Sequence, residues 1–582
     1  KATVNGSVAI DKEISVPKTP QIKECLSPAL FGEQNNFVEL EVYNFRVFFH
    51  TEKVETIEQS EIIISLEQSG KDSVKVSAKG YNGARFEPLT IFVNGKKDHS
   101  LYFSGKSFES IEKISPKEGT NTVSAEFAGK KAETTIEKNV GFAANPILGI
   151  LLVAVLLSAL FLLVFRQESL AERLAFSITG FFSLLFLPAL ALDFAGQLSA
   201  FTFTTIIALE TLAVFLLFRK NLSKVFDVAL EVKKFLKKPS FLLVGLIVFL
   251  VFSSLVYHFF TNTYVSPFTS FYERQSERIA GLEHVPQNDD LSFFGEKPLG
   301  FFSAYFFLNA GVSWLTGFDT RSSFALILFF AQLAFICASI VFFRSFGVSE
   351  KNSYLGALAV LLGVFVFSDF LYNVRHVAAD SMLLLAAVFL RREKWLQSGV
   401  VAGFASFVQT PMILMFVAIS IISLDSKKRF FDLAKALAVA GVLAAVFFAP
   451  TIMRAGFPTQ AKSTVWGYLW NIPLYGFFLD YFSIFALLAL FALPFVLLGK
   501  TNAGSFEKRL VLVILVFFAI QLFVSYRINV VTSFLLALLA ARLFPEKLLE
   551  NPFSEYALSA LVVGALISLT IVSMAFYPLH PK

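Results

Sequence analysis

Apolar runs of about the length needed to cross a bilayer recur from residue 146 to the C-terminal end of the chain. They lie near residues 147–165, 174–194, 200–218, 241–260, 322–343, 354–371, 380–391, 396–409, 411–424, 432–450, 478–499, 509–525, 528–543 and 557–577. Because only helices and closed barrels can cross a bilayer, and runs of this length suit helices, the pattern predicts a polytopic α-helical membrane protein. We expect about 13 or 14 transmembrane helices, since some of the shorter runs merge.

The first 140 residues have a different composition. They hold 18 of the 50 Lys and Arg residues and 20 of the 44 Asp and Glu residues. Short segments alternate apolar and polar residues, near 38–49, 62–66, 74–78, 89–93 and 121–127. Turn signals such as Asn94-Gly95 separate them. Seven or more short strands at this spacing predict an immunoglobulin-like β-sandwich in residues 1–140.

Basic residues predict the orientation of the chain. They cluster at Arg166 and Arg173, Arg219 to Lys238, Arg344 and Lys351, Arg391 to Lys394, Lys427 to Arg429, Lys508 and Arg509, and Arg542 and Lys547. All fall on one side when the spans alternate, and the positive-inside rule makes that side cytoplasmic. The protein is then integral to the plasma membrane with the β-sandwich outside. We also expect that a signal peptide was removed before Lys1.

The membrane part divides further. Residues 146–238 supply additional spans and a basic amphipathic helix at 226–238, and residues 241–582 form a transmembrane core with an outer loop at 261–321. Residues 299–318 are apolar as well, but a full crossing there would reverse every later loop. We therefore expect a re-entrant or interfacial helix on the outer face. The net charge of +6 arises in this membrane part, which argues against nucleic acid as a partner.

The outer loop gathers carboxylates and guanidinium groups. Residues 271–282 are predicted to form a short helix on which Arg274 and Arg278 stand one turn apart, and guanidinium groups suit phosphate. Asp289 and Asp290 follow; two adjacent carboxylates can bind Mg²⁺ or Mn²⁺, or one can act as general base, although Asp-Asp is also ordinary turn chemistry. Glu296 and Lys297 complete the set.

A second polar group lies at the mouth of a later span. Arg375, His376 and Asp380 are predicted to face outward there, and ionisable groups at membrane depth mark a site or pathway. The alternative is a local ion pair between Arg375 and Asp380. Gln409, followed by Thr410 and Pro411, breaks a hydrophobic hairpin at the same level.

These motifs resemble the C-type (GT-C) membrane glycosyltransferases, a superfamily that includes protein O-mannosyltransferases, aminoarabinose transferases and oligosaccharyltransferase-like proteins. The resemblance covers residues 241–450. The matching elements, in chain order, are Gly295-Glu296-Lys297-Pro298, Arg321 to Leu326, Arg375 with Asp380, and Arg391 to Trp395. It implies a GT-C-like core and an outer active site in which a sugar leaves a polyprenyl or dolichyl phosphate carrier for a glycan, lipid or protein acceptor.

The resemblance also implies roles for residues. Asp289 or Asp290 would act as base or metal ligand, Arg274, Arg278 and Arg375 would stabilise the phosphate leaving group, and Lys297 would assist. One departure is that Thr269 and Ser270 stand where the family carries its catalytic Asp. The alternative function is therefore an inactive membrane scaffold or binding protein. A transporter fits less well, because the ionisable groups gather at one face and no repeat is evident.

Overall fold

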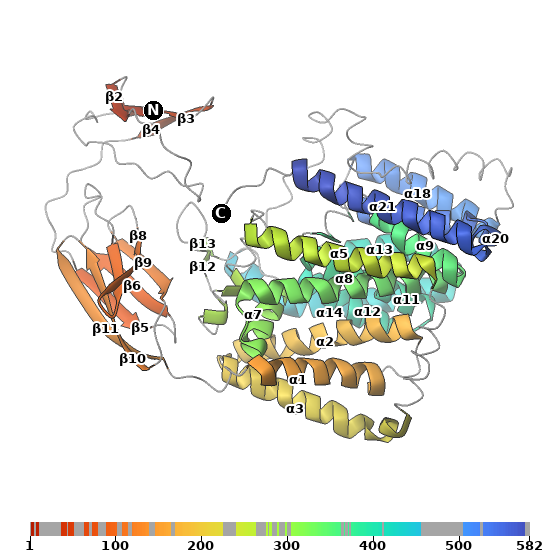
Figure 1. Cartoon of the computed structure of the whole chain (residues 1–582), viewed down its shortest axis with the longest axis horizontal. Coiled ribbons are helices and arrows are strands. Elements are labelled where there is room, and N and C mark those ends of the chain that lie inside the picture. Colours follow the sequence, from red (N-terminus) through yellow and green to blue (C-terminus); the bar gives the residue numbers. More distant parts are fainter. Residues whose placement is uncertain are drawn as a thin grey trace. The chain divides into compact units, whose positions relative to one another are not determined.

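The computed structural model describes residues 2–4, 7–10, 36–42, 45–51, 63–68, 73–79, 89–101, 107–114, 119–127, 129–138, 146–164, 169–224, 240–263, 275–277, 279–281, 288–289, 297–298, 304–362, 366, 370–371, 374–409, 412–455, 504–523 and 528–576. The chain divides into two compact units. The first is Lys1–Gly141 with Gly281–Glu283 and His580–Lys582, and the second is Phe142–Ala280 with His284–Leu579. Each unit is described by itself (Figure 1).

The first unit is built from antiparallel strands. One sheet has the order β2-β1-β3-β4, with β1 (Ala2–Val4), β2 (Ser7–Ile10), β3 (Asn36–Val42) and β4 (Phe45–Thr51). A second has the order β11-β10-β7-β8, with β7 (Leu89–Val93), β8 (Lys96–Leu101), β10 (Gly119–Phe127) and β11 (Lys130–Lys138). A third has the order β5-β6-β9, with β5 (Ile63–Gln68), β6 (Ser73–Lys79) and β9 (Ser107–Lys113).

The second and third sheets share one apolar core. Along β7, Leu89, Ile91 and Val93 are buried while the residues between them are half-buried, as the alternation of side chains along a strand requires. On the other sheet, Val74 and Val76 of β6 belong to the same buried cluster. The sequence pattern therefore predicts both which residues form strands and which face of each strand is buried.

Turns close these sheets, and one was missed from the sequence. Asn94 and Gly95 join β7 to β8 with φ of 50° and 75°, the left-handed backbone that a two-residue hairpin turn prefers. The alternation over residues 38–49 suggests one strand, but β3 and β4 form a hairpin in which Val42 pairs with Phe45. Alternation continues through the turn, so polarity alone does not reveal it.

The second unit is a bundle of helices. Its elements are α1 (Pro146–Ala159), η3 (Leu160–Val164), α2 (Leu170–Phe194), α3 (Ala200–Phe218), η4 (Arg219–Lys224), α5 (Phe241–Thr263), α7 (Ala304–Thr316), α8 (Thr320–Ser345), α9 (Glu350–Leu361), α11 (Val374–Arg391), α12 (Trp395–Val408), α13 (Met412–Ser420), η5 (Ile421–Ser423), α14 (Lys427–Ala455), α18 (Ser505–Phe523), α19 (Ile528–Leu543), α20 (Glu546–Glu550) and α21 (Pro552–Phe576). Two short strands, β12 (Asn288–Asp289) and β13 (Lys297–Pro298), complete the element order.

Six helices in the described part of this unit are long and apolar enough to cross a membrane. They begin at Ile147, Leu170, Ala200, Thr320, Lys427 and Pro552. The chain is a helical membrane protein, as the apolar runs predict. The predicted span at 478–499 and the amphipathic helix at 226–238 lie outside the described residues.

The apolar segment 299–318 contains α7, a helix of 13 residues. At 1.5 Å per residue it is about 20 Å long, which is too short for a hydrocarbon core of about 30 Å. Every α7 side chain except Ser313 is buried, and the helix packs against α1, α2, α3 and α8. A helix that is buried on all sides favours the prediction of a re-entrant helix over that of an interfacial helix.

Small residues let α12 and α14 approach closely. A Cβ added at Gly399 would lie 2.5 Å from the carbonyl oxygen of Ala436, and one added at Gly403 would lie 2.9 Å from Leu443. Two glycines four residues apart are a common way for membrane helices to bring their backbones together. This packing holds the turn before α12 beside the turn before α14.

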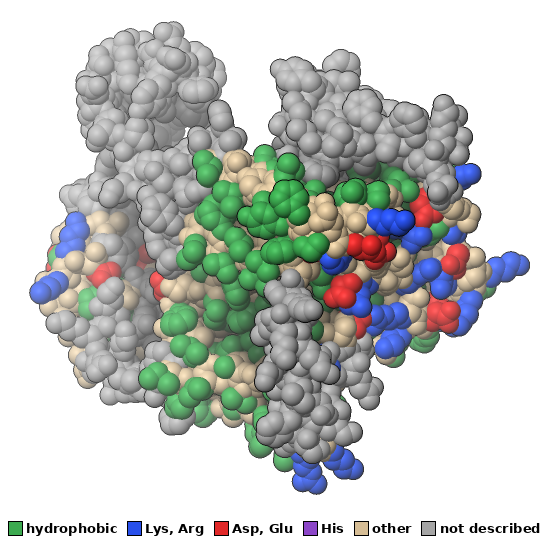
Figure 2. Space-filling model, turned by 45° about the vertical axis from the view of Figure 1, so that its right-hand side comes forward, with side chains coloured by type: hydrophobic (Ala, Val, Ile, Leu, Met, Phe, Trp, Pro, Cys, Tyr) green, Lys and Arg blue, Asp and Glu red, His purple; other side chains and the backbone are tan. Residues whose placement is uncertain are grey.

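Ion pairs join those turns to others at one end of the bundle. The pairs are Glu172 with Arg392, Asp425 with Arg391 and Arg429, Glu393 with Lys428, Glu507 with Arg542, and Glu555 with Lys351. We call the part of the bundle that holds these residues the ion-paired end. Figure 2 shows Lys, Arg, Asp and Glu gathered there beside a largely hydrophobic surface. Six basic residues that the sequence assigns to one side of the membrane therefore meet at one end of the bundle.

Candidate functional site

Three polar side chains meet where α11 begins and α12 ends. Arg375 Nη2 lies 3.0 Å from His376 Nε2, and Gln409 Nε2 lies 3.1 Å from the same imidazole nitrogen. Arg375 and Gln409 are buried and His376 is half-buried. The structure thus brings together two predicted site residues and the Gln409 that precedes the predicted helix break.

The contacts fix the state of the imidazole ring. A guanidinium group can only donate hydrogen bonds, so His376 Nε2 accepts from Arg375, and the ring is neutral with its proton on Nδ1. The Gln409 amide nitrogen points at the same acceptor. Gln409 Oε1 is buried and has no hydrogen-bond partner among the described residues. A buried amide oxygen in that state is an acceptor available to a ligand.

Arg375 and His376 lie in the first turn of α11, which contains no acidic residue. The positive end of the helix dipole is there, so a basic side chain is electrostatically unfavourable for the helix itself. The backbone N–H groups of a helix start and a guanidinium group beside them are well suited to an anion such as phosphate. Asp380, also buried, follows His376 by one turn, so the two lie on one face of α11.

Neighbouring helices hold the segment that leads into α11. Gln332 of α8 donates a hydrogen bond from Nε2 to the carbonyl oxygen of Phe370 at 2.7 Å, and its Oε1 accepts from Ser254 of α5 at 3.0 Å. Phe370 also stacks on Phe249 of α5. These contacts anchor the chain just before the first turn of α11.

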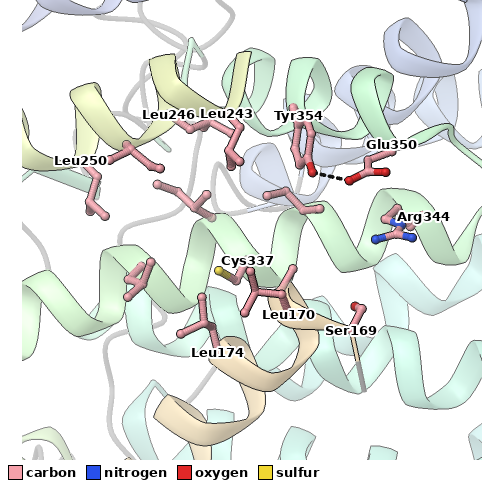
Figure 3. A pocket seen from close by; sticks show the side chains of 15 residues that line it. Ser169, Leu170, Leu174, Leu243, Leu246, Leu250, Cys337, Arg344, Glu350 and Tyr354 are labelled. Atoms are coloured by element: carbon pink, nitrogen blue, oxygen red, sulfur yellow. Dashed lines mark hydrogen bonds between the residues drawn. The ribbon is translucent and has the colours of Figure 1, made fainter. Parts of the chain in front are cut away.

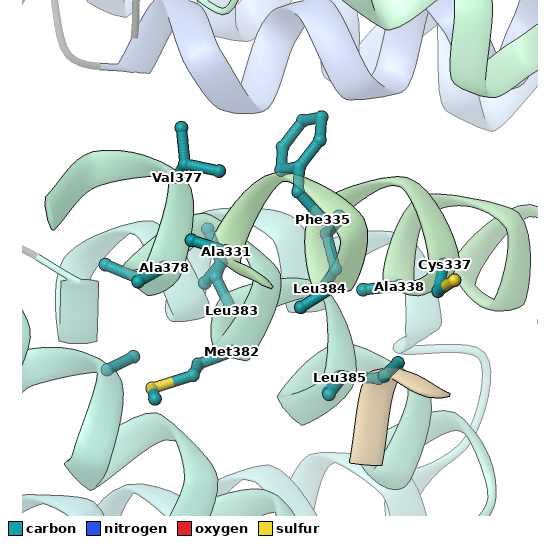
Figure 4. Close-up of a cluster of buried hydrophobic side chains, with 14 of the residues drawn as sticks. Ala331, Phe335, Cys337, Ala338, Val377, Ala378, Met382, Leu383, Leu384 and Leu385 are labelled. Atoms are coloured by element: carbon teal, nitrogen blue, oxygen red, sulfur yellow. The ribbon is translucent and has the colours of Figure 1, made fainter. Parts of the chain in front are cut away.

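The starts of α8 and α11 lie at the same end of the bundle. The two helices pack against each other, and Figure 4 shows both running from left to right, α8 from Ala331 to Ala338 and α11 from Val377 to Leu385, so they run in the same direction. We call this end, with the first turns of α8 and α11 and the last residues of α12, the Arg375 end. Arg375 is separated from Arg391, at the ion-paired end, by about 24 Å of helix.

The outer loop is described in part. In the hairpin of β12 and β13, Asp289 pairs with Lys297 across the two strands, so two predicted site residues are neighbours in backbone register. Their side chains lie outside the described residues, as do Arg274, Arg278, Asp290 and Glu296.

Sequence reasoning missed further buried polar groups near the start of α8. Gln275 and Asn309 are buried, and neither amide has a hydrogen-bond partner among the described residues; Nε and Nη2 of Arg321 share that property. Residues 279–281 are tied to α7 by a hydrogen bond from Trp314 Nε1 to the carbonyl oxygen of Ala280, at 3.1 Å. Residues 275–277 are tied to α8 by a hydrogen bond of 3.0 Å from Thr320 Oγ1 to Glu277 Oε1.

A signal for these residues was present in the sequence. Asn309 is an amide inside the apolar run 299–318, and Gln275 lies on the predicted helix 271–282. Among the described residues, no group of three or more His, Cys, Asp or Glu side chains could hold a metal ion. No family model, curated protein or solved structure matches the chain.

Proposed function

We propose that the protein transfers a sugar from a polyprenyl or dolichyl phosphate carrier to a glycan, lipid or protein acceptor. The observation that carries this proposal is the Arg375, His376 and Gln409 cluster at the start of α11. It combines a guanidinium group and the N–H groups of a helix start, which suit a phosphate ester, with a buried amide oxygen that can accept a hydrogen bond from a sugar hydroxyl. Cationic groups that are preset where a phosphate leaving group develops charge lower the barrier to transfer.

The remaining roles follow the resemblance to GT-C glycosyltransferases. Asp289 or Asp290 is the general base or the ligand of Mg²⁺ or Mn²⁺, and Arg274 and Arg278 contribute to the phosphate site. Lys297 assists. The register that pairs Asp289 with Lys297 supports a shared site, because residues paired across two strands lie on the same face of the hairpin.

The proposal includes an orientation. The Arg375 end faces outward, the ion-paired end faces the cytoplasm, and residues 1–140 contain an extracytoplasmic β-sandwich that resembles an immunoglobulin fold. The charge asymmetry between the two ends of the bundle supports the orientation. The apolar core shared by two sheets supports the sandwich.

The test is donor binding by variants of Arg375. Arg375→Ala should weaken binding of a polyprenyl phosphate sugar about ten- to a hundredfold, the effect of one charge-assisted hydrogen bond. Arg375→Lys should lose less, because it keeps the charge without the guanidinium fork. The matched control is Arg219→Ala, which removes an exposed arginine on η4 and should bind as the wild type does. Equal affinity in the wild type and Arg375→Ala would remove this residue from the site.

An inactive scaffold is the second candidate, favoured by Thr269 and Ser270 at the position where the family carries Asp. Binding of the carrier by the wild-type protein without transfer to any envelope acceptor would support it.

A further inference from the structure

An apolar cavity lies near the ion-paired end, far along α8 from its first turn. It has a volume of about 340 Å³, within the usual range for ligand sites. Helices α2, α5, α8 and α9 line it, and ten of its fifteen lining residues are leucine, isoleucine or alanine. Figure 3 shows the polar side chains Arg344, Glu350 and Tyr354 together at one side.

The shape of the cavity follows from helix spacing. On α8 the lining residues are Leu333, Ile336, Cys337, Ile340 and Arg344, which have the spacing i, i+3, i+4, i+7 and i+11 and so share one face of the helix. From Leu333 to Arg344 the wall is about 16 Å long at 1.5 Å per residue. This is about half of a 30 Å hydrocarbon core, the depth of one lipid tail.

The cavity opens to the hydrocarbon side. On α5 its lining residues are Leu243, Leu246, Ile247 and Leu250. Leu246 is buried, but Ile247 is 50% exposed. A lipid tail can therefore enter sideways between the helices, which a sugar or a polar cofactor would not do.

Charges at the rim are of both signs. The guanidinium group of Arg344 has no hydrogen bond or ion pair with any described residue, unlike the basic residues of the ion-paired end. Glu350 is also exposed, and its Oε1 accepts a hydrogen bond of 2.6 Å from the Tyr354 hydroxyl. One cation and one positioned carboxylate beside an apolar slot are complementary to a zwitterionic head group.

We infer that this cavity binds one phospholipid with an amine head group. One tail lies along α8 and α5, the phosphate meets Arg344, and the ammonium group meets Glu350. The site is separate from the Arg375 end, so the inference does not depend on the proposed glycosyl transfer.

Native mass spectrometry of the full chain in mild detergent tests this inference. The probes are 1-palmitoyl-2-oleoyl phosphatidylethanolamine and the phosphatidylglycerol with the same tails. The wild type should retain one phosphatidylethanolamine in preference to phosphatidylglycerol. Cys337→Phe fills the cavity and should lose the retained lipid. Its control Val248→Phe, on the exposed face of α5 beside the cavity, should keep it.

The rim variants make the test independent of core packing. Arg344→Gln should weaken binding about fivefold, the effect of one basic residue near a lipid surface, whereas Arg219→Gln should not. Glu350→Gln should remove the preference for the amine head group. The inference is overturned if the wild type retains no lipid or shows no head-group preference, or if each rim or cavity variant binds as its control does.

Discussion

The two ends of the helix bundle treat their polar side chains differently. At the ion-paired end, Lys351, Arg392 and Arg542 each meet a carboxylate from a distant part of the chain. At the Arg375 end, Gln409 and Arg321 keep buried polar atoms that no described residue satisfies. An unsatisfied buried polar group costs about 1–3 kcal/mol. Ion pairs therefore stabilise the first end, although Asn352 Oδ1 and Asp432 Oδ2 there also lack a partner among the described residues. At the second end the polar groups are not joined by such pairs among the described residues, and a bound ligand would offset their cost.

This difference predicts where substitutions act. Variants of the ion-paired residues should change the free energy of unfolding and leave binding of the sugar donor unchanged. Variants at the Arg375 end should weaken donor binding and change the free energy of unfolding little, because functional sites commonly violate local rules of stability.

The largest effect is expected in the outer loop. If one carboxylate of the pair is the general base, the double variant Asp289→Asn, Asp290→Asn should transfer sugar about a hundred- to ten-thousandfold more slowly. Donor binding and the unfolding temperature should not change. The measurement is single-turnover transfer of a radiolabelled sugar at saturating donor. Transfer at the wild-type rate would defeat the assignment.

Much of the fold could be predicted from the sequence, because the length of apolar runs and the alternation of apolar and polar residues are strong local signals. Apolar length predicted the helical membrane unit, and alternation predicted β5, β6, β7 and β10. The start of α11 was placed six residues late, at 380 instead of Val374, because Arg375 and His376 are polar and break the apolar run. The feature that concealed the helix start is the feature that makes it a candidate site.

The site itself could be predicted only in part. Arg375 and His376 were recognised as ionisable groups near a span. Their contact with Gln409 depends on α12 returning beside α11, a tertiary relation that no local pattern carries. Asn309 and Gln275 were missed for a related reason: an amide is unremarkable until burial shows that it lacks a partner.

The next largest effect concerns Glu555, which is nearly buried at the ion-paired end. Its side chain is 4% exposed, and its carboxylate accepts hydrogen bonds from Lys351 Nζ, at 2.6 Å, and from the Ser240 hydroxyl. Glu555→Ala should lower the free energy of unfolding by about 2 kcal/mol, between the values for exposed and buried pairs, since Lys351 is partly exposed. Denaturant titration in detergent micelles measures this. Glu550→Ala, an exposed carboxylate on the adjacent α20, is the control and should be neutral.

A smaller change in stability is expected for Gln409→Leu. The amide contributes one contact to His376 and leaves its Oε1 unsatisfied, so an apolar side chain of similar size should change the free energy of unfolding by less than about 1 kcal/mol. Affinity for the phosphate-linked donor should nevertheless fall severalfold. A large loss of stability with unchanged donor affinity would place Gln409 among the structural residues and contradict the comparison of the two ends.

The smallest effect concerns Asp425 and pH. Burial acts to raise the pKa of this carboxyl, but the hydrogen bond from Arg391 and the nearby charge of Arg429 outweigh it and hold the pKa below its ordinary value. At pH values between the folded and the unfolded pKa, the unfolded chain therefore binds more protons than the folded protein. The stabilisation is complete above the unfolded pKa of about 3.9 and is lost as the pH falls through the lower folded value.

Asp425→Asn should thus be less stable than the wild type at pH 7 by at most about 1 kcal/mol, because the pair is partly exposed and screened by water. The difference should shrink below about pH 4 as the wild-type carboxyl is protonated. Unfolding temperatures of both proteins in micelles between pH 3 and 7 measure it. Glu393→Gln, at the exposed partner of Lys428, should show no measurable change. If the difference between wild type and Asp425→Asn grew in acid, the carboxylate would not be the stabilising form, and the ion-paired end would need another explanation.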